Sequence, residues 1–243
     1  MQIRFIGAAT AALVASTAFA NPGIIWPPSQ TSSYSDAAND IANGIATGGG
    51  TLDLLGMEVS HTATDLVFSL RVNGNVTGSG SVDWGKFMIG IATGNGSGTT
   101  SGNGWGRPIN MSAPNGGMTH WVGSWVDGGG GSQLWTYGNG SWSGPAGLSG
   151  FAFAGNTITY TVSMASLGLS MGDTFYFDAY SSGGGGGDGA IDALANPNVS
   201  VQGWGDSYTS SAPNIFSYTI PAPGALALLG VAGIAAGRRS RKA

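Results

Sequence analysis

Few side chains in this sequence have the type and spacing that catalysis requires. Hydrolysis of a glycosidic bond needs two carboxylates at a fixed separation, one of them held protonated. Here Glu58 is the single glutamate, and the aspartates are scattered without a recognisable motif. His61 and His120 lack the spacing of zinc ligands. No Gly-x-Ser-x-Gly nucleophile elbow stands at a predicted strand-to-helix turn to pair with either histidine. These residue types favour a protein that is not an enzyme, with a secreted glycoside hydrolase as the less favoured alternative.

A cluster of aromatic residues offers a different chemistry. Exposed indole rings stack on the faces of sugar rings, so a row of them is typical of glycan-binding surfaces. Aromatic side chains on alternate strand positions also fill sandwich cores or pack across strands, and this interpretation stays open beside the first. Trp121 and Trp125 would share one face of their strand, as would Trp135 and Tyr137. The candidate glycan contacts are Trp105, Trp121, Trp125, Trp135, Tyr137 and Trp142.

Charge is distributed unevenly along the chain. Five of the eight cations lie in the two ends, so the body keeps only Arg71, Lys86 and Arg107 against all twelve acidic residues. The body therefore has a net charge of −9 with histidine neutral, which excludes nucleic-acid binding by phosphate neutralisation. Such a body could recruit Ca²⁺ outside the cell. There is no cysteine, which excludes a disulfide framework and thiol chemistry.

Alternating apolar residues predict a β-rich body that would position these side chains. Three segments alternate clearly, namely 66–72, 157–164 and 173–180. The 45 glycines and several Asn-Gly pairs supply turns between them. Weaker strand patterns cover 87–92, 120–126, 133–137, 150–154 and 216–220.

We therefore expect an all-β fold, a single glycine-rich antiparallel β-sandwich of the jelly-roll-like kind. Glycine-rich tracts at 94–106, 128–132 and 183–189 would be surface loops on this scaffold. Residues 35–46 would hold a short helix, and residues 165–169 a turn between two strands.

The two ends predict export. Residues 1–20 contain one cation, an apolar stretch and the small residues Ala18 and Ala20 at a cleavage site, as in a secretory signal peptide. Near the other end, Ala225–Gly237 is an apolar run of 13 residues, about 20 Å long as a helix. It predicts a short membrane helix, and the basic tail 238–243 would stay on the cytoplasmic side. Its cations are Arg238, Arg239, Arg241 and Lys242.

The segment before the basic tail has a recognisable order of residues. It reads Pro221, Ala222, Pro223, Gly224 and then Ala-Leu-Ala-Leu-Leu-Gly. This layout resembles the PEP-CTERM sorting signal of bacterial exported proteins, although Ala222 stands where the family motif has glutamate. The resemblance implies recognition by an exosortase-type membrane enzyme, cleavage near the motif, and delivery to the surface of a bacterium that makes exopolysaccharide.

A second resemblance concerns the body. The segments 36–40, 52–60 and 64–72, and later 158–178 with its Leu-Gly-Leu step and Gly-Asp turn, are similar to CBM9-like and DOMON-like sandwiches. That resemblance implies binding of sugars or haem, or an accessory domain with bound Ca²⁺. Only Asp36 and Asp40 match positions that would ligate Ca²⁺, and the family's Gly-Asp pair reads Asn39-Asp40 here. No other cofactor is expected.

The expected organisation is a signal peptide at 1–20, a β-sandwich domain at 21–219 and a sorting signal at 220–243. We expect a non-enzymatic, exported bacterial protein, anchored transiently in the membrane and then released to the cell surface or extracellular matrix. The alternative is a carbohydrate-binding module that holds exopolysaccharide, with Ca²⁺ stabilising its fold.

Overall fold

The computed structural model describes residues 24–26, 31–77 and 85–222. The predicted signal peptide, the apolar segment Ala225–Gly237 and the basic tail all lie outside these ranges. Within the described ranges, no helix has the length and apolar character needed to cross a membrane. Almost all regular structure in this part of the chain is β-strand.

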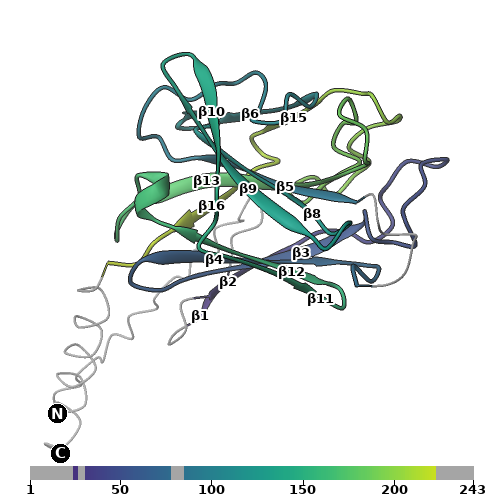
Figure 1. The fold of residues 1–243 in the computed structure, drawn as a ribbon, viewed down its shortest axis with the longest axis horizontal. Coiled ribbons are helices and arrows are strands. Elements are labelled where there is room, and N and C mark those ends of the chain that lie inside the picture. The colour runs from purple at the N-terminus through teal and green to yellow at the C-terminus, as the bar shows by residue number, and fades with distance from the viewer. Residues whose placement is uncertain (1–23, 27–30, 78–84, 223–243) are drawn as a thin grey trace, which may run out of the picture.

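The first sheet has six antiparallel strands. Strand β4 (Asp65–Val72) lies near its centre, between β3 (Leu54–His61) and β12 (Thr157–Ser163). The remaining strands are β2 (Thr31–Ser35) and β1 (Ile24–Trp26) beyond β3, and β11 (Gly150–Ala154) beyond β12. Figure 1 shows this sheet as the lower layer of the molecule.

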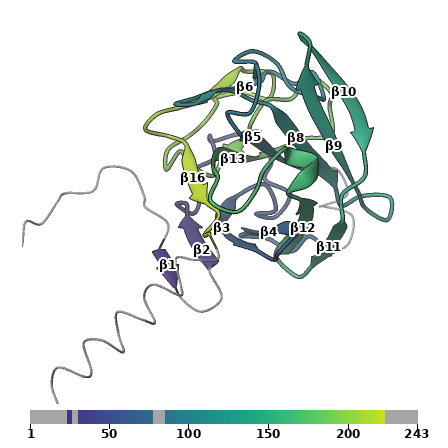
Figure 2. The same cartoon turned by 90° about the vertical axis from the view of Figure 1, so that its left-hand side faces the viewer.

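The second sheet lies above the first in Figure 1, and its central strands pair antiparallel. Its order is β10 (Ser141–Ala146), β9 (Gly131–Gly138), β8 (His120–Trp125), β5 (Lys86–Ala92) and β13 (Thr174–Ser182). The far side of β13 pairs with two short strands, β14 (Asp192–Ala193) and β16 (Phe216–Thr219). Strand β16 lies beside β2 in Figure 2, and the Tyr34 hydroxyl donates to the Ser217 carbonyl at 2.7 Å.

A small third sheet covers part of the outer face of the second. It contains β6 (Ile109–Ala113), which pairs with β7 (Gly116–Gly117) and runs parallel to β15 (Tyr208–Ser211). A 3₁₀ turn, η1 (Ala165–Leu167), joins β12 to the segment before β13. Gly168 ends this turn in a left-handed conformation with φ of 65°, so the sequence expectation of a turn here is confirmed.

The main apolar core lies between the two large sheets. Alternate residues of β4 (Leu66, Phe68, Leu70 and Val72) are fully buried there. They meet Phe87 and Ile89 of β5 and the phenylalanines of β13 across the sandwich. Each such side chain contributes about 1.5–3 kcal/mol when fully buried. The alternation seen in the sequence thus reports the face that each strand turns to this core.

A second apolar cluster lies on the other face of the second sheet, under the small third sheet. Met88, Trp121 and Tyr180 project from the large sheet, and Ile109 and Met111 of β6 cover them. This cover explains why β5 and β8 are buried on both faces, which a two-layer sandwich would not require.

The predicted all-β, antiparallel architecture is confirmed in outline, and each of the eight predicted strand segments contains a strand. Gly131 and Ser132, expected in a loop, instead begin β9. The sequence patterns also missed several strands, among them the polar β2 and the Pro-containing β10.

The short helix predicted for residues 35–46 is wrong. Ser35 ends β2, and residues 36–46 form an irregular loop in which Asn39 has a left-handed φ of 65°. The Asn39 amide donates to both carboxylate oxygens of Asp53, at 3.0 and 3.1 Å, instead of joining a helix.

Candidate functional site

Three aspartates from two distant parts of the chain form an acidic cluster. Asp36 and Asp40 lie in the loop that follows β2, and Asp192 belongs to β14 at the edge of the second sheet. One carboxylate oxygen from each lies within 4.8 Å of the others. The sequence singled out Asp36 and Asp40 but missed Asp192, whose signal was a lone acid within the apolar run Ala190–Leu194.

Hydrogen bonds satisfy only part of this cluster. Asp192 accepts the Leu54 amide at 2.7 Å and the Ala193 amide at 2.8 Å, and Asp36 accepts the Ala37 amide at 2.8 Å. The second oxygen of Asp36 and both oxygens of Asp40 are buried without a hydrogen-bond partner in the described part of the chain. Buried carboxylate oxygens without a partner are costly, so they point to a missing positive charge.

The electrostatics agree with this geometry. Burial, followed by the charge of Asp192, raises the pKa of Asp36 to about 9. Burial, followed by the charge of Asp40, raises the pKa of Asp192 to about 8. Burial also raises the pKa of Asp40. Without a cation, Asp36 and Asp192 would hold protons at neutral pH, whereas a bound cation would let them ionise.

The donor set of the acidic cluster fits Ca²⁺. Calcium prefers hard oxygen ligands, and three carboxylates with free lone pairs supply them. Asp36, Asp40 and Asp192 would hold the ion, which would act structurally by joining the loop after β2 to the second sheet. Leu54, whose amide binds Asp192, begins β3, so the ion would also tie the first sheet to the second.

Asp53 holds the loop that carries Asp40 in place. It is 2% exposed, and its carboxylate accepts the Asn39 amide and, at 2.9 Å, the Asn73 side-chain amide. These bonds leave Asp53 with partners of its own and fix the loop that carries Asp40. Asp53 is therefore a positioning residue for the acidic cluster rather than a fourth ligand.

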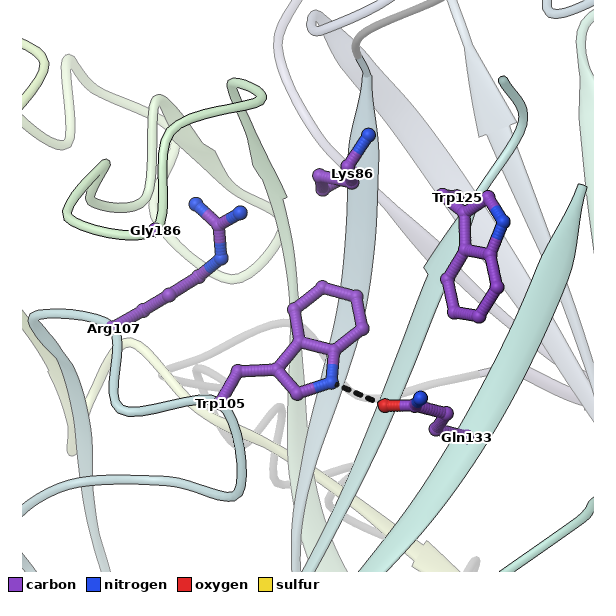
Figure 3. Close-up of a pocket in the computed structure, with 6 residues that line it drawn as sticks. All are labelled: Lys86, Trp105, Arg107, Trp125, Gln133 and Gly186. Carbon is purple, nitrogen blue, oxygen red and sulfur yellow. Dashed lines mark hydrogen bonds between the residues drawn. The ribbon is translucent and has the colours of Figure 1, made fainter. Parts of the chain in front are cut away.

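The aromatic residues form a second site, which we call the aromatic cleft. It has a volume of about 300 Å³, and Figure 3 shows the Trp105 and Trp125 rings on its walls. Trp105 comes from the loop before β6, and Trp125 ends β8. The cleft is lined by Lys86, Trp105, Arg107, Trp125, Gln133 and Gly186.

Two glycines bring the indoles flat against the sheet. A Cβ atom added at Gly123 would lie 2.3 Å from the Trp105 ring, and one added at Gly131 would lie 2.2 Å from the Trp125 ring. Both distances are too short for real side chains. The cross-strand register places Trp125 opposite Lys86 on one side and Gly131 on the other, so these three share the outer face of the sheet.

Hydrogen bonds fix the orientation of Gln133 in the cleft. Its side-chain oxygen accepts the indole N–H of Trp105 at 2.8 Å and that of Trp135 at 3.1 Å. An indole nitrogen only donates, so the oxygen of the amide must be the acceptor of both. The Gln133 NH₂ group is thereby turned away from the indole donors, and Figure 3 shows it facing the cleft.

The cations of the cleft have fixed roles. The Lys86 ammonium pairs with both carboxylate oxygens of Asp127, at 2.9 and 3.0 Å. Arg107 is 5% exposed, lies 5.6 Å from the centre of the Trp105 ring and donates to the Ser182 hydroxyl and the Gly183 carbonyl. Arg107 therefore anchors the glycine-rich loop that forms one wall.

The structure divides the six predicted aromatic contacts. Trp121 is fully buried and stacks on Tyr180 with ring centres 5.8 Å apart, so it is a core residue and cannot contact a glycan. Tyr137 and Trp142 pack edge to face at 5.3 Å, and Trp135 packs against the second apolar cluster. Only Trp105 and Trp125 line the cleft, and Trp125 packs against neither apolar cluster.

The other residues considered for chemistry do not converge. Glu58 is exposed on β3, His61 binds the Tyr218 hydroxyl at 2.8 Å, and His120 is buried with a pKa lowered by burial to about 4. Of the sorting motif, Pro221 is half-buried and Ala222 exposed, while Pro223 and Gly224 lie outside the described residues. The predicted signal cleavage residues Ala18 and Ala20 and the four tail cations also lie outside them.

The sequence matches no protein-family model, and no curated protein is significantly similar to it.

Proposed function

We propose that this protein is a non-enzymatic, exported bacterial protein of the cell surface or extracellular matrix. A signal peptide would direct export, and residues 220–243 would act as a PEP-CTERM-like sorting signal recognised by an exosortase-type enzyme. The finer architecture belongs to the same proposal: a jelly-roll-like sandwich between a signal helix and a short membrane helix at Ala225–Gly237.

The observation that carries the proposal is the place where the folded body ends relative to the motif. Strand β16 stops at Thr219, and Ile220 is fully buried, with its amide donating to Asp173 at 2.8 Å. Exposure increases at once, from half-buried Pro221 to exposed Ala222. Cleavage within residues 221–224 would therefore leave every strand of the described residues in place, as a sorting enzyme requires of its cargo.

Comparison of the full chain with a variant truncated after Ile220, both expressed in the host, tests this function. The full chain should reach the cell surface or matrix, and the truncated chain should remain in the periplasm or leak into the medium. A matched variant, Arg71→Gln, changes a cation of the body and should be sorted normally. Identical distribution of full and truncated chains would contradict the proposal.

A second function, binding of exopolysaccharide, is favoured by the aromatic cleft. Two half-buried indoles flank an oriented amide donor, which is the combination of ring faces and hydrogen-bonding groups that sugars require. Retention of the protein on the host's own polysaccharide tests it. Retention should fall in Trp125→Ala and stay unchanged in Glu58→Gln, a surface variant on the other sheet.

The acidic cluster favours a structural ion over hydrolysis. A glycosidase needs its two carboxyl groups to face a bound sugar. The orphan oxygens of Asp36 and Asp40 are buried instead, and a Ca²⁺ ion would satisfy them without any substrate.

A further inference from the structure

We infer that the aromatic cleft binds an uncharged glycan, with Trp105 and Trp125 contacting the sugar rings and Gln133 selecting for hydroxyl groups. This inference rests on the polysaccharide-binding function proposed above and names its ligand class. Three independent features of the cleft lead to it: its charge balance, its open donors and its shape.

The charge balance of the cleft argues against an acidic ligand. Lys86 is already neutralised by Asp127 in a two-oxygen ion pair, and Arg107 is buried against carbonyl and hydroxyl oxygens. No cation of the cleft is left to meet a carboxylate or sulfate. The surrounding body has a net charge of −9, so a polyanion would be repelled on approach.

The open donors of the cleft suit hydroxyl groups. The Gln133 NH₂ and the Trp125 indole N–H have no acceptor among the described residues, and neither atom is buried. Sugar hydroxyls accept from such donors, and the Asp127 carboxylate beside Lys86 is able to accept from them in return. A ligand without hydroxyl groups would leave these donors unpaired in the complex.

The shape of the cleft suits a short stretch of a chain. The volume of about 300 Å³ is at the small end for ligand sites, so it would hold one or two sugar rings. Because Trp125 packs against neither apolar cluster, its ring is available for contact without loss of core packing. Arg107 acts as a positioning residue, because it orders the loop around Gly183 and lies against Trp105.

Binding measurements with polysaccharides of known charge test the inference on the protein isolated from its host. The uncharged probes are dextran, mannan, xylan and soluble β-glucan, and the acidic probes are alginate and polygalacturonate. We expect binding to at least one uncharged probe, unchanged by added salt, because no ion pair forms.

Two variants assign the binding to the cleft. Trp125→Ala should weaken it at least about tenfold, since it removes a stacking face. Gln133→Glu keeps the acceptor for both indoles but removes the NH₂ donor, and should weaken binding about two- to tenfold. The matched control, Tyr137→Ala, removes an aromatic ring from the same face of β9 outside the cleft and should bind normally. Circular dichroism confirms folding in each case.

The outcomes separate the two claims. Salt-sensitive binding to alginate or polygalacturonate alone would overturn the uncharged class while leaving polysaccharide binding intact. Two results would overturn the cleft as a glycan site altogether. One is that the protein binds neither any probe nor the host polysaccharide. The other is binding that survives both Trp125→Ala and Gln133→Glu.

Discussion

The acidic cluster buries carboxylate oxygens that lack partners, whereas the aromatic cleft presents satisfied polar groups and open donors to solvent. At the cluster, the unpaired carboxylate oxygens of Asp36 and Asp40 cost free energy, which a bound cation would offset. At the cleft, Lys86 and Arg107 are already paired, so an empty cleft carries no such cost. We therefore propose that the cluster acts on stability and the cleft on recognition, a difference that can be measured.

The largest expected effect separates core from cleft within one strand. Trp121 and Trp125 share a face of β8, but Trp121 is fully buried and Trp125 is not. Trp121→Ala should lower the free energy of unfolding by about 3–5 kcal/mol. Trp125→Ala should lower it by about 1 kcal/mol or less, since it leaves no closed cavity. Urea unfolding measures both, and equal losses would show that Trp125 is a core residue.

The pH dependence of stability tests the acidic cluster. In the ion-free protein the pKa values of Asp36 and Asp192 are about 9 and 8, above the ordinary value of 3.8. Between the ordinary pKa of 3.8 and these raised values, the folded state then binds more protons than the unfolded state. The stability contributed by Asp36 and Asp192 should therefore be complete below about pH 4. It should fall by a few kcal/mol as the pH rises towards 9.

Denaturation with a chelator at pH 7, pH 8 and pH 9 measures this slope, and added Ca²⁺ should flatten it. His120 acts in the opposite direction, because its lowered pKa costs stability only below its ordinary value of 6.5. Working at pH 7 and above separates the two contributions. A stability that rises from pH 7 to pH 9 without ions would contradict the account of the cluster.

Calcium should raise the melting temperature. Ligand at about one hundred times its dissociation constant adds about 2.7 kcal/mol, or about 5–10 °C for a domain of this size. Asp192→Asn should abolish the increase because it removes the ligand from β14. Glu58→Gln, an exposed acid outside the cluster, should retain it. Differential scanning calorimetry with and without a chelator gives the answer, and an unchanged melting temperature would exclude a tight site.

The smallest expected effect is that of the acidic cluster on glycan affinity at the cleft. They share no residue, so glycan affinity should be unchanged by Asp192→Asn or by a chelator at temperatures where the protein stays folded. Isothermal titration with the bound polysaccharide checks this. A loss of affinity on ion removal would show that the cluster also orders the cleft.

Much of the fold could be predicted because alternation directly reports burial in a sandwich. Leu66 to Val72 alternates, and the strand packs as its pattern indicates. The third sheet could not be predicted, since β6 is short and its role depends on covering Met88 and Trp121 from another part of the chain. Residues 35–46 failed as a helix because tertiary contacts with Asp53 decide their conformation.

The sites were also predictable only in part, because they too depend on contacts between distant parts of the chain. Asp36 and Asp40 are close in sequence, but Asp192 joins them only through the pairing of β14 with β13. The aromatic cluster was visible as a set, yet sequence does not report which indole the third sheet covers. Gln133 carried no signal at all, because its role depends on the two indole N–H groups that meet at its oxygen.

The central claim is that this body is exported and then separated from its C-terminal segment. The intact mass of the protein recovered from the membrane and the matrix of its own host tests that claim most directly. The account predicts a matrix species that begins at Asn21 and ends within residues 221–224. A matrix species that still carries Arg238 to Ala243 would contradict it, because the segment would then be a plain anchor or no signal at all.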